Sequence, residues 1–149
     1  MLAPHQLEEL LQNVPPPAWS FRPNPDAWSI NEVVVHLADN EAVDFVRTRL
    51  ALAGSESPHL PYDEARWARD LDYEREPAPE ALAAFSVLRS RTYGLFGRIP
   101  DTAWSRPLKG PHDATLTLEE RLRSAVEHDE LHRSQIQDLH TGWERALGG

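Results

Sequence analysis

The sequence predicts an all-α protein, a bundle of four helices. Apolar residues recur at helical spacing in four segments, and no segment sustains the alternation that is typical of a half-buried strand. Start and stop signals for helices flank these segments. A chain of 149 residues is long enough to bury a core of its own, so we expect a single domain over residues 1–149.

The first two helices are expected over residues 5–14 and 29–53. Leucine and valine recur at helical spacing in the first, and three consecutive prolines end it. The second begins at a capping box formed by Ser29 and Glu32 and ends before a glycine. Three consecutive valines inside it would also suit a strand, but their capped and periodic setting favours a helix.

The third helix is expected over residues 77–99, after a segment, 63–73, that suits a short helix. Proline and glutamate stand in its first turn, where both are favoured. Gly94 and Gly97 weaken the prediction for its last turns. Long connections join it to the second and fourth helices, and a helical bundle of this kind can hold cofactor chemistry in its core.

The fourth helix is expected over residues 117–140. It opens with a second capping box, Thr117 with Glu120, and we expect Gly142 to end it. Residues 100–116 contain prolines and a glycine, so they are expected to form a loop.

Charge and composition exclude several classes of function. The chain has 15 basic and 24 acidic residues, a net charge of −9, and no basic run, which argues against nucleic-acid binding. No stretch approaches the roughly 18 apolar residues of a membrane span, so we expect a cytoplasmic protein that does not engage a membrane. Because the chain has no cysteine, any thiol chemistry needs a thiol supplied by a substrate or cofactor.

Three histidines carry most of the functional information. His128 and His132 stand four residues apart in a segment without proline or glycine, so in a helix their rings point to the same side. The helical wheel places His132 inside the apolar stripe and His128 at its margin. His36 lies about 90 residues earlier, at the edge of the apolar stripe of the second helix. From there it can face a cleft between helices.

Three imidazoles can bind one divalent metal ion. Without a carboxylate ligand they leave its charge uncompensated and coordination positions open, which is typical of a catalytic site. Imidazole suits zinc, nickel and iron, and also copper, so the ligands do not select the metal. The alternative is that the histidines are polar or hydrogen-bonded residues on helix faces. A pair at this spacing arises easily by chance among seven histidines.

Five further residues could orient the rings or contact a substrate. Asp129 and Glu41 fall within apolar stripes, where a carboxylate needs a histidine N–H or an arginine as its partner, unless it reaches water at a helix boundary. Gln135 lies close to the histidine pair and can hydrogen-bond there. Asn40 and Arg47 share a side of the second helix with its histidine. Arg47 is either a contact for an anionic substrate group or a solvated helix residue.

These motifs resemble those of the DinB/YfiT-like superfamily, and the resemblance covers nearly the whole chain. It implies an up-down-down-up four-helix bundle that is often dimeric, so we expect a homodimer. It also implies that three histidines bind a divalent metal. The residues that carry it follow a proline-bearing connector in this order: Trp28-Ser29, Glu32, His36-Leu37, His128-Asp129, His132 and Gln135-Ile136.

The resemblance also implies candidate activities. Members of known activity use a low-molecular-weight thiol, such as bacillithiol, mycothiol or glutathione, in transfer or isomerisation. Our first hypothesis is therefore a metal-dependent thiol S-transferase that acts on a small-molecule substrate, with the thiol bound to the metal as thiolate. The alternatives are a hydrolase that uses metal-activated water and a non-catalytic, stress-related dimeric bundle. The complete triad favours an enzyme, and the lack of an obvious general base argues mildly against hydrolysis.

Overall fold

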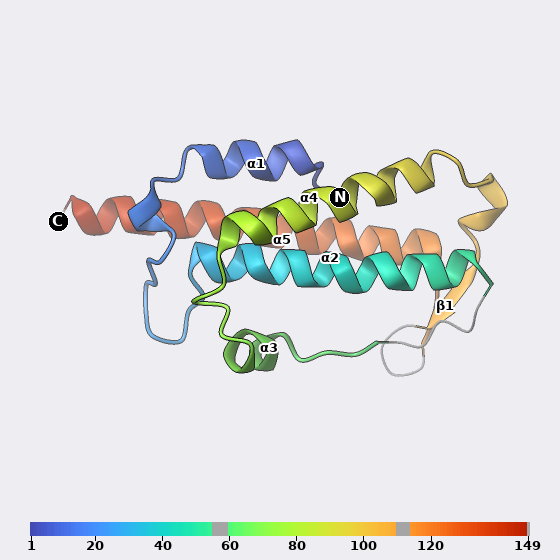
Figure 1. Cartoon of the computed structure of the whole chain (residues 1–149), viewed down its shortest axis with the longest axis horizontal. Helices are drawn as coiled ribbons and strands as arrows, with labels where there is room; N and C mark the ends of the chain where they lie inside the picture. The colour runs from blue at the N-terminus through green and yellow to red at the C-terminus, as the bar shows by residue number, and fades with distance from the viewer. Residues whose placement is uncertain (55–59, 110–113, 149) are drawn as a thin grey trace.

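The computed structural model describes residues 1–54, 60–109 and 114–148 of the chain, and five α-helices and one small hairpin lie within them (Figure 1). The helices are α1 (Pro4–Gln12), α2 (Ile30–Leu52), α3 (Glu64–Asp70), α4 (Ala78–Phe96) and α5 (Leu118–Leu147). The strands are β1 (Pro107–Lys109) and β2 (Thr115–Thr117), which pair antiparallel. Short 3₁₀ turns occupy Pro16–Ala18 and Asp101–Ala103.

Four of the helices form the expected bundle. Figure 1 shows α2 and α4 running in one direction and α1 and α5 in the opposite one, which confirms the up-down-down-up order. Helix α2 packs against both α4 and α5, and α1 packs against α4. The short helix α3 lies beside α2 and outside the bundle, in the long connection that leads to α4 (Figure 1).

Both capping boxes predicted from the sequence are present. The Ser29 hydroxyl accepts a hydrogen bond from the Glu32 backbone N–H, and the Glu32 carboxylate accepts one from the Ser29 N–H at 2.7 Å. Thr117 and Glu120 make the same reciprocal pair at the start of α5. Each box satisfies N–H groups that the first turn leaves without helical partners, so both long helices start where the sequence indicated.

The main core lies where α1, α2, α4 and the second half of α5 meet. Its largest fully buried apolar side chains are Leu7, Ile30, Leu37, Tyr73, Phe85 and Ile136. A smaller cluster lies around Leu118, Leu108 and Ala51, toward the hairpin. Between these two clusters, α2 carries four buried polar side chains, those of Asn40, Glu41, Arg47 and Thr48.

Two expectations about the C-terminal part were wrong. Gly142 does not end α5, which continues to Leu147. A glycine costs a helix only about 1 kcal/mol relative to alanine, and the partly buried Trp143 packs the following turn against the core. A Cβ at position 142 would lie 3.4 Å from the Phe21 ring, which is an ordinary van der Waals contact. The predicted loop 100–116 contains β1 and overlaps the start of β2, and these three-residue strands are too short to show alternation.

Other boundaries differ only slightly from expectation. Helix α1 ends at Gln12 rather than at residue 14, and α4 ends at Phe96 with Gly97 as its C-cap. The predicted short helix over residues 63–73 is confirmed as α3, with Asp63 as its N-cap. Within the described ranges, no helix has the length and apolar character that crossing a membrane requires.

Candidate metal centre

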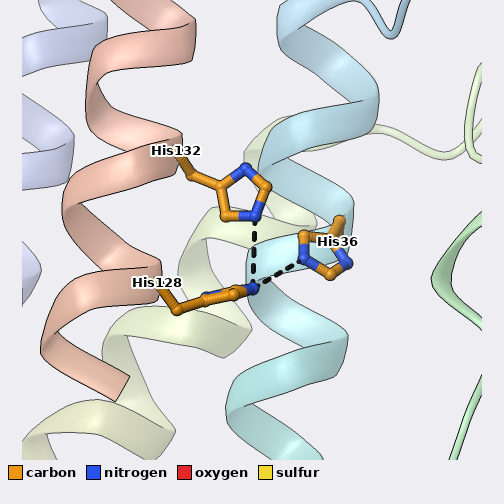
Figure 2. Close-up of side chains that lie close together, drawn as sticks. All are labelled: His36, His128 and His132. Carbon is orange, nitrogen blue, oxygen red and sulfur yellow. Dashed lines mark hydrogen bonds between the residues drawn. The ribbon is translucent and has the colours of Figure 1, made fainter. Parts of the chain in front are cut away.

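Helices α2 and α5 bring the three predicted histidines together (Figure 2). His36 projects from the second turn of α2, while His128 and His132 project from consecutive turns of α5. The side chain of His36 is fully buried, His132 is 6% exposed, and His128 is partly buried. Residues 92 positions apart in the chain are thus fixed by two packed helices rather than by loops.

The distances between the ring nitrogens suit a shared ion. The Nε2 atom of His128 lies 3.1 Å from Nε2 of His36 and 3.2 Å from Nε2 of His132. Metal–nitrogen bonds of about 2.0–2.1 Å place neighbouring ligand atoms about 2.9 Å apart at right angles and about 3.4 Å apart at tetrahedral angles. These two separations fall between these limits, and the ligand atoms of all three rings lie within 4.8 Å of one another, so the rings can converge on one ion.

Hydrogen bonding among the rings alone leaves a conflict. Nδ1 of His132 lies 2.8 Å from the Oε1 acceptor of Gln135, which assigns the ring proton to Nδ1 and leaves a lone pair on Nε2. Nε2 of His128 can donate to that lone pair, but it then has none left to accept a bond from His36. Three neutral rings therefore cannot all be satisfied by one another, whereas a cation accepts all three lone pairs.

Burial keeps the rings of His36 and His128 neutral, as metal ligands must be. Desolvation, followed by the neighbouring rings of His132 and His128, lowers the pKa of His36 from 6.5 to about 3. Desolvation and then His132 likewise lower the pKa of His128 to about 4, although the carboxylates of Asp129 and Asp44 oppose this shift. At neutral pH both rings present lone pairs rather than positive charge.

Of the five residues predicted to surround the triad, Gln135 is in direct contact with it, through the bond to Nδ1 of His132. Such a bond fixes the tautomer and orientation of a metal-binding ring. The Trp28 ring lies against His36 with 5.1 Å between ring centroids. Among the described residues, Nδ1 of His36 and Nδ1 of His128 have no hydrogen-bond partner.

Asp129 and Glu41 are buried and paired, as expected, but with an arginine and not with the histidines. The Arg89 guanidinium binds Glu41 Oε2 at 2.7 Å and both carboxylate oxygens of Asp129 at 2.7 and 3.1 Å. Burial raises the pKa of Glu41, and the charge of Arg89 opposes that shift. The two acids therefore belong to a separate ionic cluster inside the bundle.

Asn40 and Arg47 are both buried beside the segment that follows α2. Asn40 Oδ1 accepts a hydrogen bond from the Tyr62 hydroxyl at 2.9 Å. Arg47 donates to Asp44 at 3.1 Å and also to the backbone oxygen of Leu60. Arg47 is thus not a solvated helix residue, and its predicted contact with a substrate stays a prediction.

A carboxylate that the sequence analysis missed lies next to the triad. Glu64, in the first turn of α3, places Oε2 3.9 Å from Nε2 of His36, and its side chain is 48% exposed. The hydrogen bond between Tyr62 and Asn40 ties this segment to α2. Nothing in the local sequence distinguishes Glu64 from the other acids of residues 63–76, because its position depends on how the connection folds back.

The arrangement agrees with known proteins. The family model of the DinB superfamily matches residues 2–136. The structure of YfiT from Bacillus subtilis, described as a probable metal-dependent hydrolase with an unusual four-helix bundle topology, superposes with a TM-score of 0.83 and 26% identity. The match covers 98% of this chain and 82% of that one.

Curated relatives carry the same kind of description. The YfiT sequence, named "Putative metal-dependent hydrolase YfiT", is 29% identical over 119 residues, which are 78% of this chain and 67% of that protein. A relative from Oceanobacillus iheyensis with the same descriptive name is 27% identical over 112 residues, or 75% of this chain and 64% of its own length. This chain thus spans about two thirds of these relatives. The helix order, the histidine cluster and the extent of the family match together show that the chain belongs to the DinB superfamily.

Proposed function

We propose that this protein is a metal-dependent hydrolase whose metal ligands are His36, His128 and His132. The observation that carries the proposal is the Glu64 carboxylate 3.9 Å from Nε2 of His36, beside the point where the three ring nitrogens converge. A general base next to an open metal position is what hydrolysis requires and what the sequence alone did not reveal. The names of the relatives support the same reaction class.

The chain's own residues have distinct roles in this proposal. A divalent ion, for which zinc, nickel and iron are all suitable, would supply a Lewis acid that acidifies water and polarises a carbonyl or phosphoryl group. Glu64 accepts the proton of the attacking water at Oε2, and its half-exposed position lets it pass that proton to solvent. Gln135 holds the His132 ring with Nε2 toward the centre.

The same carboxylate weakens the thiol S-transferase hypothesis. A thiolate entering the open position would stand close to the negative charge of Glu64, which repels a second anion and favours neutral water. In favour of the transferase are the absence of cysteine from the chain and the positive charge that three neutral ligands leave on the metal. It remains our second candidate, and a cofactor thiol such as bacillithiol would be its co-substrate.

The test compares Glu64→Gln with Glu74→Gln in protein loaded with zinc, nickel or iron. Glu74 is an exposed acid of the same connecting segment and pairs only with Arg22 among the described residues. With a panel of esters, amides and phosphoesters, we expect Glu64→Gln to lower kcat by about 10²–10⁴-fold and Glu74→Gln to leave it within about twofold. Metal affinity, measured by competition with a chromogenic chelator, should change little in either variant.

Other outcomes decide between the candidates. A loss of metal affinity in Glu64→Gln as large as in His36→Ala would make Glu64 a ligand and remove it as the base. Turnover of an electrophile that requires a thiol as well as metal, with no hydrolysis by the metal form alone, would establish the transferase. Full metal occupancy in both His36→Ala and His132→Ala would disprove the ligand set.

The oligomeric state stays a prediction. Helix α4 carries more apolar residues than one helical stripe holds, but they are buried or partly buried within the single chain: Ala81, Leu82, Phe85, Leu88, Leu95 and Phe96. They therefore do not require a second copy, and the expectation of a homodimer rests on the resemblance alone. Light scattering at micromolar concentration tests it, and a monomeric mass would contradict it. A cytoplasmic location likewise stays a prediction.

A further inference from the structure

Two arginines share one carboxylate near the histidine triad. Arg47 of α2 donates to Asp44 Oδ1 at 3.1 Å, and Arg121 of α5 donates to the same oxygen. Arg47 is 6% exposed and is further fixed by the backbone oxygen of Leu60. Two guanidinium groups and one carboxylate leave this cluster with a net charge of +1, in a chain whose overall net charge is −9.

The cluster lies along the same pair of helices as the candidate metal centre. Arg121 precedes His128 by seven residues, which is about 10 Å along a helix axis. Asp44 and Arg121 are both close enough to His128 for their charges to act on it. Tyr62 donates a hydrogen bond to Asn40, which lies one turn beyond His36 on α2. The charges of both arginines and of Glu64 act on this tyrosine.

The arginines retain unused hydrogen-bonding capacity. Among the described residues, Nε of Arg47 and Nε of Arg121 have no acceptor although both atoms are buried. The Arg121 side chain is 24% exposed, so this residue lies at the edge of the cluster and not deep inside it. A guanidinium fork matches the two oxygens of a carboxylate or phosphate, and an uncompensated buried charge is stabilised when such an anion arrives.

We propose that Arg121, supported by Arg47, binds an anionic group of the substrate, a carboxylate or a phosphate, while the bond to be hydrolysed lies at the histidine triad. The proposal rests on the proposed hydrolase function and adds the substrate class to it. The surrounding negative charge of the chain repels anions elsewhere, so a local cationic cluster beside the reactive centre selects where the anionic end of a substrate docks.

The first experiment measures charge selectivity with two matched esters, 4-nitrophenyl butyrate and the 4-nitrophenyl monoester of glutarate. We expect Arg121→Met to lower kcat/KM for the glutarate ester by about 10–100-fold and to leave the neutral ester within about twofold. Arg123→Met is the matched control, because Arg123 lies on the same helix and forms only an exposed pair with Glu119 among the described residues. It should change neither ester by more than about twofold.

The second experiment needs no activity. Titration calorimetry on the metal-free protein uses glutarate and inorganic phosphate as separate probes, which distinguishes a carboxylate site from a phosphate site. We expect one of them to bind the wild type and the Arg123→Met variant, and to bind Arg121→Met at least about 10-fold more weakly. Arg121→Lys keeps the charge opposite Asp44 but loses the fork, so it should fold and show intermediate binding. It replaces Arg121→Met if circular dichroism shows that variant to be unfolded.

The results separate this inference from the function on which it rests. Equal losses for both esters, or anion binding that is absent in the wild type or unchanged in the Arg121 variants, would overturn the anion site. Anion binding that depends on Arg121, in a protein that hydrolyses no ester, amide or phosphoester, would retain the site and reject the hydrolase.

Discussion

Two buried polar clusters lie side by side in this bundle and differ in how well their groups satisfy one another. His128 and Asp129 are adjacent on α5, yet the first belongs to the histidine triad and the second to the ionic cluster around Arg89. On α2, His36 likewise belongs to the histidine triad and Glu41 to the ionic cluster. One pair of helices thus carries both clusters, which are one residue apart on α5 and five residues apart on α2.

The ionic cluster is closed. Arg89, which is 1% exposed, donates to Glu41, to Asp129 and to the backbone oxygen of Leu2 at 2.9 Å. Asp129 also accepts the Leu2 N–H at 2.9 Å, and Thr92 lies 3.4 Å from Glu41. Donors and acceptors are matched, and the N-terminal residues are tied into the same network.

The histidine triad is open. The three Nε2 atoms lie close together, but neutral rings cannot satisfy all of them by hydrogen bonds to one another. The Nδ1 atoms of His36 and His128 also lack partners among the described residues. Buried polar groups therefore have two uses in one core. A matched cluster contributes to holding the helices together, whereas an unmatched one is completed by something that binds.

The largest predicted effect is on the closed cluster. Arg89→Met leaves two carboxylates buried and unpaired, so we expect the free energy of unfolding in urea to fall by about 3–5 kcal/mol. The control is Arg133→Met, whose pair with Glu130 is at the surface and worth at most about 1 kcal/mol. Equal losses in the two variants would mean that the closed cluster contributes no more than a surface ion pair.

The next effect tests whether the open cluster is completed by metal. At a free concentration of zinc or nickel about 100-fold above its Kd, we expect the unfolding free energy to rise by about 2.7 kcal/mol. The metal-free protein should keep its helical circular dichroism, because apolar packing supplies the core. His132→Ala should abolish the increase. Loss of most helical signal on chelation would instead make the metal structural and favour the non-catalytic bundle.

Features that depend on local contacts could be predicted from the sequence. Ser29 with Glu32 and Thr117 with Glu120 are local pairs, three residues apart, so the starts of both long helices could be predicted from the sequence. The histidine triad could be predicted because two of its members share a helix face and the third lies in a motif typical of the family. Helical periodicity and short-range capping decide such features.

Sequence reasoning fails where tertiary contacts decide. The need of Asp129 and Glu41 for partners could be predicted, but not that Arg89, 40 and 48 residues away from them, serves both. Glu64 reaches the triad only because the connection after α2 folds back. Gly142 gave a stop signal that packing against the core overrides, since the aromatic residue after it stabilises the continued helix.

The smallest predicted effect is that of replacing Gln135, which hydrogen-bonds to one ring of the histidine triad. Gln135→Leu removes the acceptor at Nδ1 of His132, so the ring loses the contact that fixes its tautomer and orientation. We expect metal to bind about 10–100-fold more weakly. The metal-free protein should unfold within about 0.5 kcal/mol of the wild type, because Gln135 is only partly buried and supports no ion pair.

Gln137→Leu is the matched control, since Gln137 lies on the exposed side of α5 and accepts a bond only from Arg133 among the described residues. Its metal affinity should equal that of the wild type. An equal loss in both variants would assign the effect to the helix as a whole. A loss confined to Gln135→Leu would show that metal binding by the histidine triad depends on the orientation of the rings as well as on their identity as ligands. In the ionic cluster, by contrast, the charge of Arg89 holds its two carboxylate partners in place.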